Sequence, residues 1–173
     1  MRLISNYACP MRHACAMLVA SAALWFPGIT VAEEWSAGGG LTYQFDPTSS
    51  AYVVFGAWTP QADRYEFAAF RFLTSQKRAG ELVAAPNWVF EASKRWRWTV
   101  SPRIHAFAGF GAAFKTKTDD VNGSRLNFAE SLGCRFVLSA HLPVIEVALR
   151  HISNAGLKRP NRGEDFATIA LVF

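Results

Sequence analysis

Ile145-Glu146-Val147-Ala148-Leu149-Arg150-His151-Ile152-Ser153 is the stretch that decides the fold class. Its side chains alternate between two faces, as they do in a β-strand. One face is apolar and ends in a histidine and a serine; it is formed by Ile145, Val147, Leu149, His151 and Ser153. In a water-soluble sheet that face would be buried and the His/Ser pair sealed off. In a transmembrane barrel it meets lipid, so the pair would face a lipid substrate.

The rest of the chain after about residue 32 repeats this pattern, whereas helical periodicity is scarce. Alternating segments bounded by turn residues predict eight strands, near 34–45, 51–60, 64–75, 84–95, 98–115, 124–138, 142–153 and 164–173. In the sixth of these, an apolar row from Leu126 to Phe136 is interrupted by Glu130. A polar contact or a β-bulge is the expected explanation for that interruption.

Eight strands of about ten residues fit a minimal outer-membrane barrel, whose strands need roughly 9–11 residues to span the membrane. Longer polar connections are expected at 76–83, 116–123 and 154–163, and short ones at 61–63, 96–97 and 139–141. Long loops outside and short turns in the periplasm are usual for such barrels. Five tryptophans fall near expected strand ends, as in an aromatic girdle: Trp35, Trp58, Trp88, Trp96 and Trp98.

The predicted fold class is therefore all-β, an eight-stranded antiparallel transmembrane β-barrel at 33–173. A soluble eight-stranded barrel is the structural alternative. Two features argue against it. The chain ends in Phe173 on an alternating strand, which resembles the C-terminal signature of bacterial outer-membrane proteins. The second feature is the N-terminal segment.

Residues 1–32 have the features of a secretory signal peptide. Basic Arg2 and Arg12 precede an apolar run from Ala14 to about Phe26, and small residues before Glu33 offer a cleavage site. The run is shorter than the roughly 20 apolar residues of a membrane helix, although a signal anchor is the alternative. Met1 or Met11 could be the true start, since the stretch from Met11 is a complete signal by itself.

Composition excludes several classes of protein. The signal contains two of the 18 basic residues and no acidic ones, so the mature chain keeps 16 basic against 13 acidic residues, a net charge of +3. This weak excess, without an RNA-binding signature, does not indicate nucleic acid. Cys134 is the only cysteine outside the signal, which excludes an intramolecular disulfide and a cysteine-based zinc site. The remaining 141 residues suffice for one domain.

Three reactive side chains are expected to converge at the outer end of the barrel. With the N-terminus in the periplasm, the strand ending in His151 and Ser153 runs outward and the next strand returns. Counting back by twos from Phe173 puts Asp165 on the same lipid-facing side, whereas Glu164 points inward if no bulge intervenes. A serine becomes a nucleophile when an imidazole takes its proton and a carboxylate fixes the imidazole tautomer.

The segment His151-Ile152-Ser153-Asn154-Ala155-Gly156-Leu157-Lys158, followed by Pro160-Asn161 and Gly163, resembles the active-site signature of the PagL family of lipid A 3-O-deacylases. The resemblance covers roughly residues 145–173 and implies an eight-stranded outer-membrane barrel with its active site facing the outer leaflet. It implies catalytic residues Ser153 as nucleophile, His151 as base and Asp165 as acid. The family's acid is usually a glutamate, so Glu164 stays open as the alternative.

The resemblance also implies that Asn154 and Gly156 lie near the oxyanion site and that Asn161 helps shape the loop. The implied reaction is hydrolysis of the ester at position 3 of the lipid A glucosamine, with release of a 3-hydroxy fatty acid and without metal or cofactor. The expected partners are lipopolysaccharide as substrate and outer-membrane lipid. Three basic residues could attract the lipid A phosphates or could be ordinary solvated charges: Lys158, Arg159 and Arg162.

Other functions remain open at this point. A non-catalytic small outer-membrane barrel, used for structure or adhesion, would need no Ser/His/Asp convergence. A phospholipase that depends on calcium would need additional oxygen ligands, and an acyltransferase would need an acyl pocket inside the barrel. The sequence does not decide between a monomer and a possible homodimer.

Overall fold

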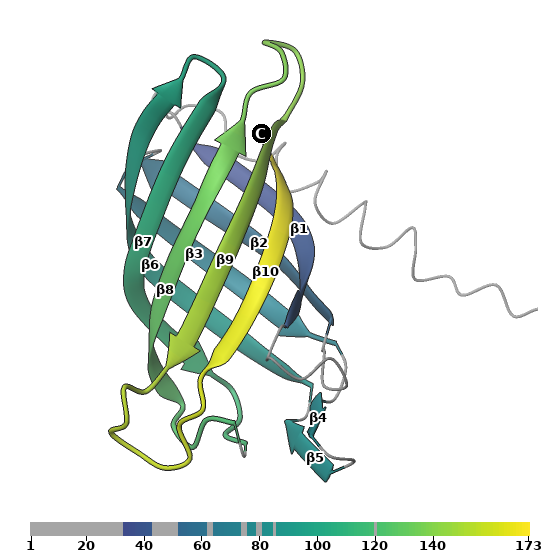
Figure 1. Ribbon diagram of the computed structural model, residues 1–173, viewed down its shortest axis with the longest axis vertical. Helices are drawn as coiled ribbons and strands as arrows, with labels where there is room; N and C mark the ends of the chain where they lie inside the picture. The colour runs from purple at the N-terminus through teal and green to yellow at the C-terminus, as the bar shows by residue number, and fades with distance from the viewer. Residues whose placement is uncertain are drawn as a thin grey trace, which may run out of the picture. The chain divides into compact units, whose positions relative to one another are not determined.

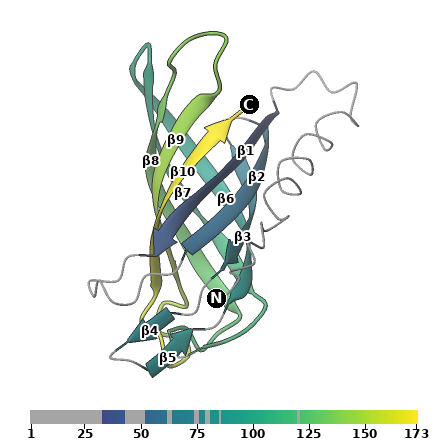
Figure 2. The same ribbon diagram turned by 90° about the vertical axis from the view of Figure 1, so that its right-hand side faces the viewer.

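Eight antiparallel strands close into a barrel in this computed structural model (Figures 1 and 2). The structure describes residues 33–42, 52–61, 64–73, 76–78, 81–84, 86–119 and 121–173. The expected signal peptide, with Met11 and the first two cysteines, lies outside the described residues. In order around the barrel the strands are β1 (Glu34–Thr42), β10 (Glu164–Val172), β9 (Val144–Ser153), β8 (Leu126–Phe136), β7 (Ile104–Lys115), β6 (Asn87–Ser101), β3 (Tyr65–Phe72) and β2 (Tyr52–Gln61).

The predicted fold class is thus confirmed, and the connections expected at 96–97 and 76–83 differ from expectation. The expected connection at 96–97 is wrong, because β6 continues to Ser101 and the turn to β7 lies at 102–103. Arg95 is buried inside the barrel while Trp96 continues the outward row, so the alternation of β6 runs through this position. The expected loop at 76–83 contains a separate two-stranded sheet of β4 (Gln76–Arg78) and β5 (Glu81–Ala84).

The outward face of the barrel is apolar and the inward face is largely polar, which is the arrangement of a transmembrane barrel. On β9 the outward Val147 and Leu149 are exposed, whereas the inward Glu146 and Arg150 are buried. Pairing of β1 with β10 closes the barrel. At its edge the Trp35 N–H donates to the Phe173 carbonyl, and the Phe173 N–H donates to the Trp35 carbonyl. None of the described residues belong to a helix long and apolar enough to cross a membrane.

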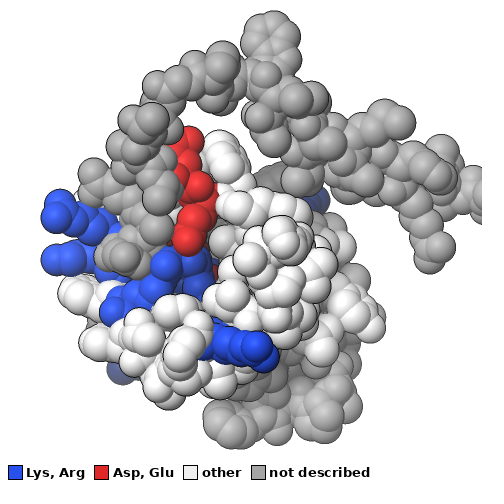
Figure 3. Space-filling view, turned by 90° about the horizontal axis from the view of Figure 1, so that it is seen from above, with Lys and Arg blue, Asp and Glu red and all other residues white. Residues whose placement is uncertain are grey.

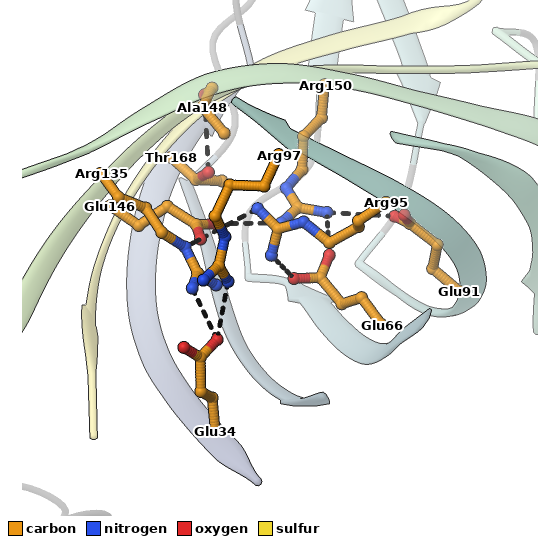
Figure 4. Close-up of polar contacts among 10 residues, drawn as sticks. All are labelled: Glu34, Glu66, Glu91, Arg95, Arg97, Arg135, Glu146, Ala148, Arg150 and Thr168. Atoms are coloured by element: carbon orange, nitrogen blue, oxygen red, sulfur yellow. Dashed lines mark hydrogen bonds and ion pairs between the residues drawn. The ribbon is translucent and has the colours of Figure 1, made fainter. Parts of the chain in front are cut away.

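Compensating charges fill part of the interior (Figure 4). Arg95 donates to Glu66 and Glu146, and Arg150 donates to Glu66 and Glu91. Both arginines are almost completely buried. Since a buried charge is tolerated when it is paired and hydrogen-bonded, these contacts hold β3, β6 and β9 together across the lumen. Next to them lies an aromatic cluster of stacked and edge-on rings: Phe55, Phe70, Phe72 and Phe166.

Charged and aromatic side chains mark the end of the barrel that carries the C-terminus. Acidic and basic side chains both gather at this end (Figure 3), where Glu34 accepts from Arg97 and Arg135. Four of the five tryptophans of the expected girdle lie on strand segments at this end, and Trp88 lies at the opposite end of β6. The alternation of the strands thereby directs tryptophans outward near both ends, as an interfacial girdle requires.

Candidate active site

His151 and Asp165 form a hydrogen bond on the outward face of the barrel. Nδ1 of His151 lies 2.7 Å from Oδ1 of Asp165, and both side chains are about one third exposed. The two residues are directly paired across β9 and β10, so the pleat sends both side chains to the same face. A carboxylate at Nδ1 holds the proton there and leaves Nε2 free to accept one. This is the geometry of a histidine prepared to act as a base.

Ser153 completes the outward group at the last position of β9. It is half-buried and lies on the same face as His151, two residues away, where same-face Cα atoms are roughly 7 Å apart. Within the described part of the chain its hydroxyl makes no hydrogen bond. Catalytic hydrogen bonds are often formed only when the substrate is present.

Glu164, the alternative acid, is buried on the inner face and bound to a different partner. Its Oε1 accepts from Nζ of Lys115 at 2.9 Å, and the same ammonium donates to Asp119 at 2.7 Å. Lys115 is completely buried. The barrel wall therefore separates Glu164 from His151, and the facing expected from the count back from Phe173 is observed for both acidic residues.

Asn154 is buried and uses its side chain to hold the turn that follows Ser153. Nδ2 donates to the Lys158 carbonyl at 2.7 Å and to Oδ1 of Asn122 at 3.0 Å, while Oδ1 accepts from the Gly156 N–H at 3.0 Å. Both amide hydrogens are thus used within the protein. The Asn154 side chain therefore supports the loop, and its donors are not directed at the exterior.

The turn itself contains two residues in the left-handed region, Ala155 with φ 51° and Gly156 with φ 80°. That conformation is uncommon for alanine and persists where the surroundings impose it. The Gly156 N–H is bound to Asn154, whereas the Ala155 N–H makes no hydrogen bond among the described residues. An unsatisfied backbone donor next to Ser153 is a candidate for stabilising an oxyanion.

Asn161 joins this turn to a second loop. Its Oδ1 accepts from the Asn154 N–H at 3.0 Å, and it forms a β-bridge with Asn122 in the β7–β8 loop. Further backbone bonds tie Gly123 to Pro160 and Arg162 to Val121. Asn161 therefore links the β9–β10 turn to the β7–β8 loop. The supporting role of Asn122 was missed, because nothing in the sequence indicates that these two loops meet.

The three basic residues expected to contact phosphates lie together on the loop between β9 and β10. Lys158, Arg159 and Arg162 are exposed, and none of the three side chains makes an ion pair with a described residue. Arg150, by contrast, points into the lumen and is bound to glutamates there. The loop therefore presents positive charge beside the outward histidine.

Sequence comparisons match most of the chain to one family. The profile described as "Lipid A 3-O-deacylase (PagL)" matches residues 37–173. A curated relative, "Lipid A deacylase PagL" of Bordetella bronchiseptica (strain ATCC BAA-588 / NCTC 13252 / RB50), is 33% identical over 96 residues. This match covers 51% of the present chain and 52% of the relative, so the chain spans about half the length of the curated relative.

Two solved structures have a similar fold. "Crystal structure of the outer membrane enzyme PagL" matches with a TM-score of 0.55 and 21% identity, over 81% of this chain and 98% of that one. "Neisserial surface protein A (NspA)" matches with a TM-score of 0.53 and 9% identity, over 81% and 92% of the two chains. These similarities support the barrel fold, and the fold alone does not distinguish an enzyme from other surface proteins. The family is shown by the profile match over residues 37–173, and the chain belongs to the lipid A 3-O-deacylase (PagL) family.

Proposed function

We propose that this protein is a lipid A 3-O-deacylase, a serine esterase of the bacterial outer membrane. The observation that carries the proposal is the His151–Asp165 hydrogen bond on the apolar exterior, with Ser153 on the same face. A histidine–carboxylate pair on that surface has no evident structural purpose, since charged groups on the lipid face destabilise a barrel. Its position suits an ester whose acyl chains already lie in the membrane.

In the proposed reaction, Ser153 Oγ attacks the carbonyl carbon of the acyl chain at position 3 of the glucosamine. Nε2 of His151 takes the hydroxyl proton, and Asp165 stabilises the imidazolium that forms. The tetrahedral intermediate collapses as His151 returns the proton to the departing sugar oxygen. The products of this half-reaction are an acyl group on Ser153 and the 3-hydroxyl of the sugar.

Water completes the cycle by attacking the acyl-serine ester while His151 removes its proton. Collapse of this second intermediate releases a 3-hydroxy fatty acid and restores the Ser153 hydroxyl. The free Ala155 N–H supports a role as oxyanion donor, while Asn154, Gly156 and Asn161 hold the turn that presents it. Removal of one oxyanion donor typically lowers kcat by about 100- to 1,000-fold.

Substrate binding follows from the surroundings of the site. Phe128 lies opposite Ser153 on β8, and Leu149 precedes His151 on the same outward face. These apolar side chains suit acyl chains, and the exposed basic residues of the β9–β10 loop suit the phosphates of lipid A. Both features support a substrate in the outer leaflet, with the loop at the level of the head groups.

Mass spectrometry of lipid A from cells with and without the protein tests the proposal. We expect the loss of one 3-hydroxyacyl group from position 3, with the amide-linked chains retained, and we expect Ser153→Ala to abolish that loss. A non-catalytic barrel is the competing function, supported by the similarity to a surface protein. Unchanged lipid A in both strains would favour it and would contradict the deacylase assignment.

A further inference from the structure

Few polar side chains lie on the exterior of this barrel. Apart from tyrosines and the last residues of β2 and β6, six polar residues occupy outward positions on the described barrel strands, and they are Arg71, Lys94, Glu130, His151, Ser153 and Asp165. Three of the six form the proposed catalytic group. The other three therefore require an explanation, because a charge facing lipid is unfavourable.

Two of these three have an aromatic partner. The Arg71 guanidinium lies over the Trp88 ring, 5.5 Å from its centroid, and the Lys94 ammonium lies over the Trp96 ring at 5.2 Å. A cation on an indole face is stabilised by the ring quadrupole, and its long stem follows the apolar surface. Glu130 differs, because it is exposed and makes no hydrogen bond or ion pair with any residue in the described ranges.

Strand register places Glu130 beside the catalytic histidine. Glu130 on β8 is directly paired with His151 on β9, and His151 is directly paired with Asp165 on β10. Directly opposed residues of antiparallel strands have Cβ atoms roughly 5 Å apart. The imidazole is thus flanked by a carboxylate on each side. Two residues further along β9, Ser153 is paired with Phe128 of β8.

The histidine cannot bind both carboxylates while it acts as a base. Its Nδ1 is engaged with Asp165, and its Nε2 has to receive the proton of Ser153. Glu130 therefore keeps its acceptor oxygens available, on the exterior and next to the place where the scissile ester must lie. An acceptor in that position is complementary to a hydrogen-bond donor of the substrate.

We propose, on the basis of the deacylase function above, that Glu130 is a substrate-binding residue that recognises the sugar of the glycolipid. Its carboxylate accepts a hydrogen bond from a hydroxyl or an amide N–H of the glucosamine that carries the scissile ester. The negative charge repels phosphate, so the phosphates are directed to the basic β9–β10 loop and the sugar is oriented between the two. Glu130 thereby distinguishes glycolipid esters from esters without a sugar.

Steady-state kinetics of the purified protein in detergent micelles test this role with two substrates. One is lipid A, and the other is the p-nitrophenyl ester of a short fatty acid, which has no sugar. We expect Glu130→Ala to lower kcat/KM for lipid A by about 10- to 100-fold, as for a lost hydrogen bond to a charged group. The loss should appear mainly in KM, because the contact is already made in the ground state.

For the nitrophenyl ester we expect Glu130→Ala to leave kcat/KM within about twofold of wild type. On lipid A we expect the pH profile of kcat of the same variant to keep the wild-type midpoint. Glu130→Gln should lose less than Glu130→Ala, since its amide oxygen is a neutral acceptor. Leu132→Ala is the matched control, because Leu132 is the next outward residue on β8 and is apolar. It should retain wild-type values on both substrates.

Equal losses on both substrates, or a displaced pH profile, would show that Glu130 acts through His151 and would overturn the proposal. Full activity of Glu130→Ala on lipid A would overturn it as well. Failure of the deacylase function itself gives a different result, because wild type would then release no hydroxyacyl chain or Ser153→Ala would stay active. Heat-modifiable migration in electrophoresis verifies that each variant is folded.

Discussion

Gly163 lies against the imidazole of His151. A Cβ built on Gly163 would stand 2.5 Å from Cε1 of the ring and 3.3 Å from Nε2. The glycine is the last residue before β10, opposite the end of β9, and its φ of 70° is in the left-handed region. The absence of a side chain at Gly163 lets the imidazole of His151 lie close to the backbone there.

Substitution of Gly163 by alanine should therefore displace the histidine ring. A misplacement of about 1 Å in a catalytic group can lower the rate by about 100-fold, and we expect Gly163→Ala to lower kcat by at least about that factor. Gly56→Ala is a suitable control, because the nearest atom to its added Cβ is 3.8 Å away. Activity on lipid A measures the effect, and a fully active Gly163→Ala protein would contradict the close approach.

The two neighbouring acidic residues should respond differently to substitution. Asp165→Asn removes the carboxylate that fixes the His151 tautomer, and the corresponding change in a serine-protease triad lowers kcat by about 10,000-fold. Asp165→Ala should likewise lose more activity than Glu164→Ala, because Glu164 is bound to Lys115 inside the barrel. Initial rates of hydroxyacyl release compare the variants. A larger loss for Glu164→Ala would contradict the assignment of Asp165 as the orienting acid.

The alternation from Ile145 to Ser153 predicted both the fold class and the facing of the site, because a period of two is a local property of the chain. Counting from Phe173 placed Asp165 outward for the same reason. Contacts between distant segments leave no such pattern. The bond between Asn154 and Asn122 joins loops that are 32 residues apart, and the pairing of Glu130 with His151 depends on strand register. The end of β6 was mispredicted, and the inward Arg95 there binds Glu66 and Glu146 on other strands, contacts that leave no local pattern.

Loss of the Asn122 side chain should loosen the turn that follows Ser153. Oδ1 of Asn122 accepts from Nδ2 of Asn154 at 3.0 Å in a completely buried position, and a buried donor left without a partner costs about 1–3 kcal/mol. We expect Asn122→Ala to lower kcat by about 10- to 100-fold with little change in KM. Ser124→Ala, in the same loop with an exposed hydroxyl bond, should be nearly neutral. Equal activity of the two variants would show that the β7–β8 loop does not position the site.

Removal of the buried Arg150 charge should affect stability far more than catalysis. Arg150 is completely buried and binds Glu66 and Glu91, and removal of one partner from a buried charge network costs about 3–5 kcal/mol. We expect Arg150→Met to lower the free energy of unfolding by about that amount, measured by urea titration in lipid vesicles. Because Glu91 would then lack its partner, the double variant with Glu91→Gln should recover part of the loss. The Glu91→Gln change removes the charge of the glutamate and preserves the shape of its side chain. A double variant less stable than Arg150→Met would therefore contradict the view that the loss of stability arises from an uncompensated glutamate.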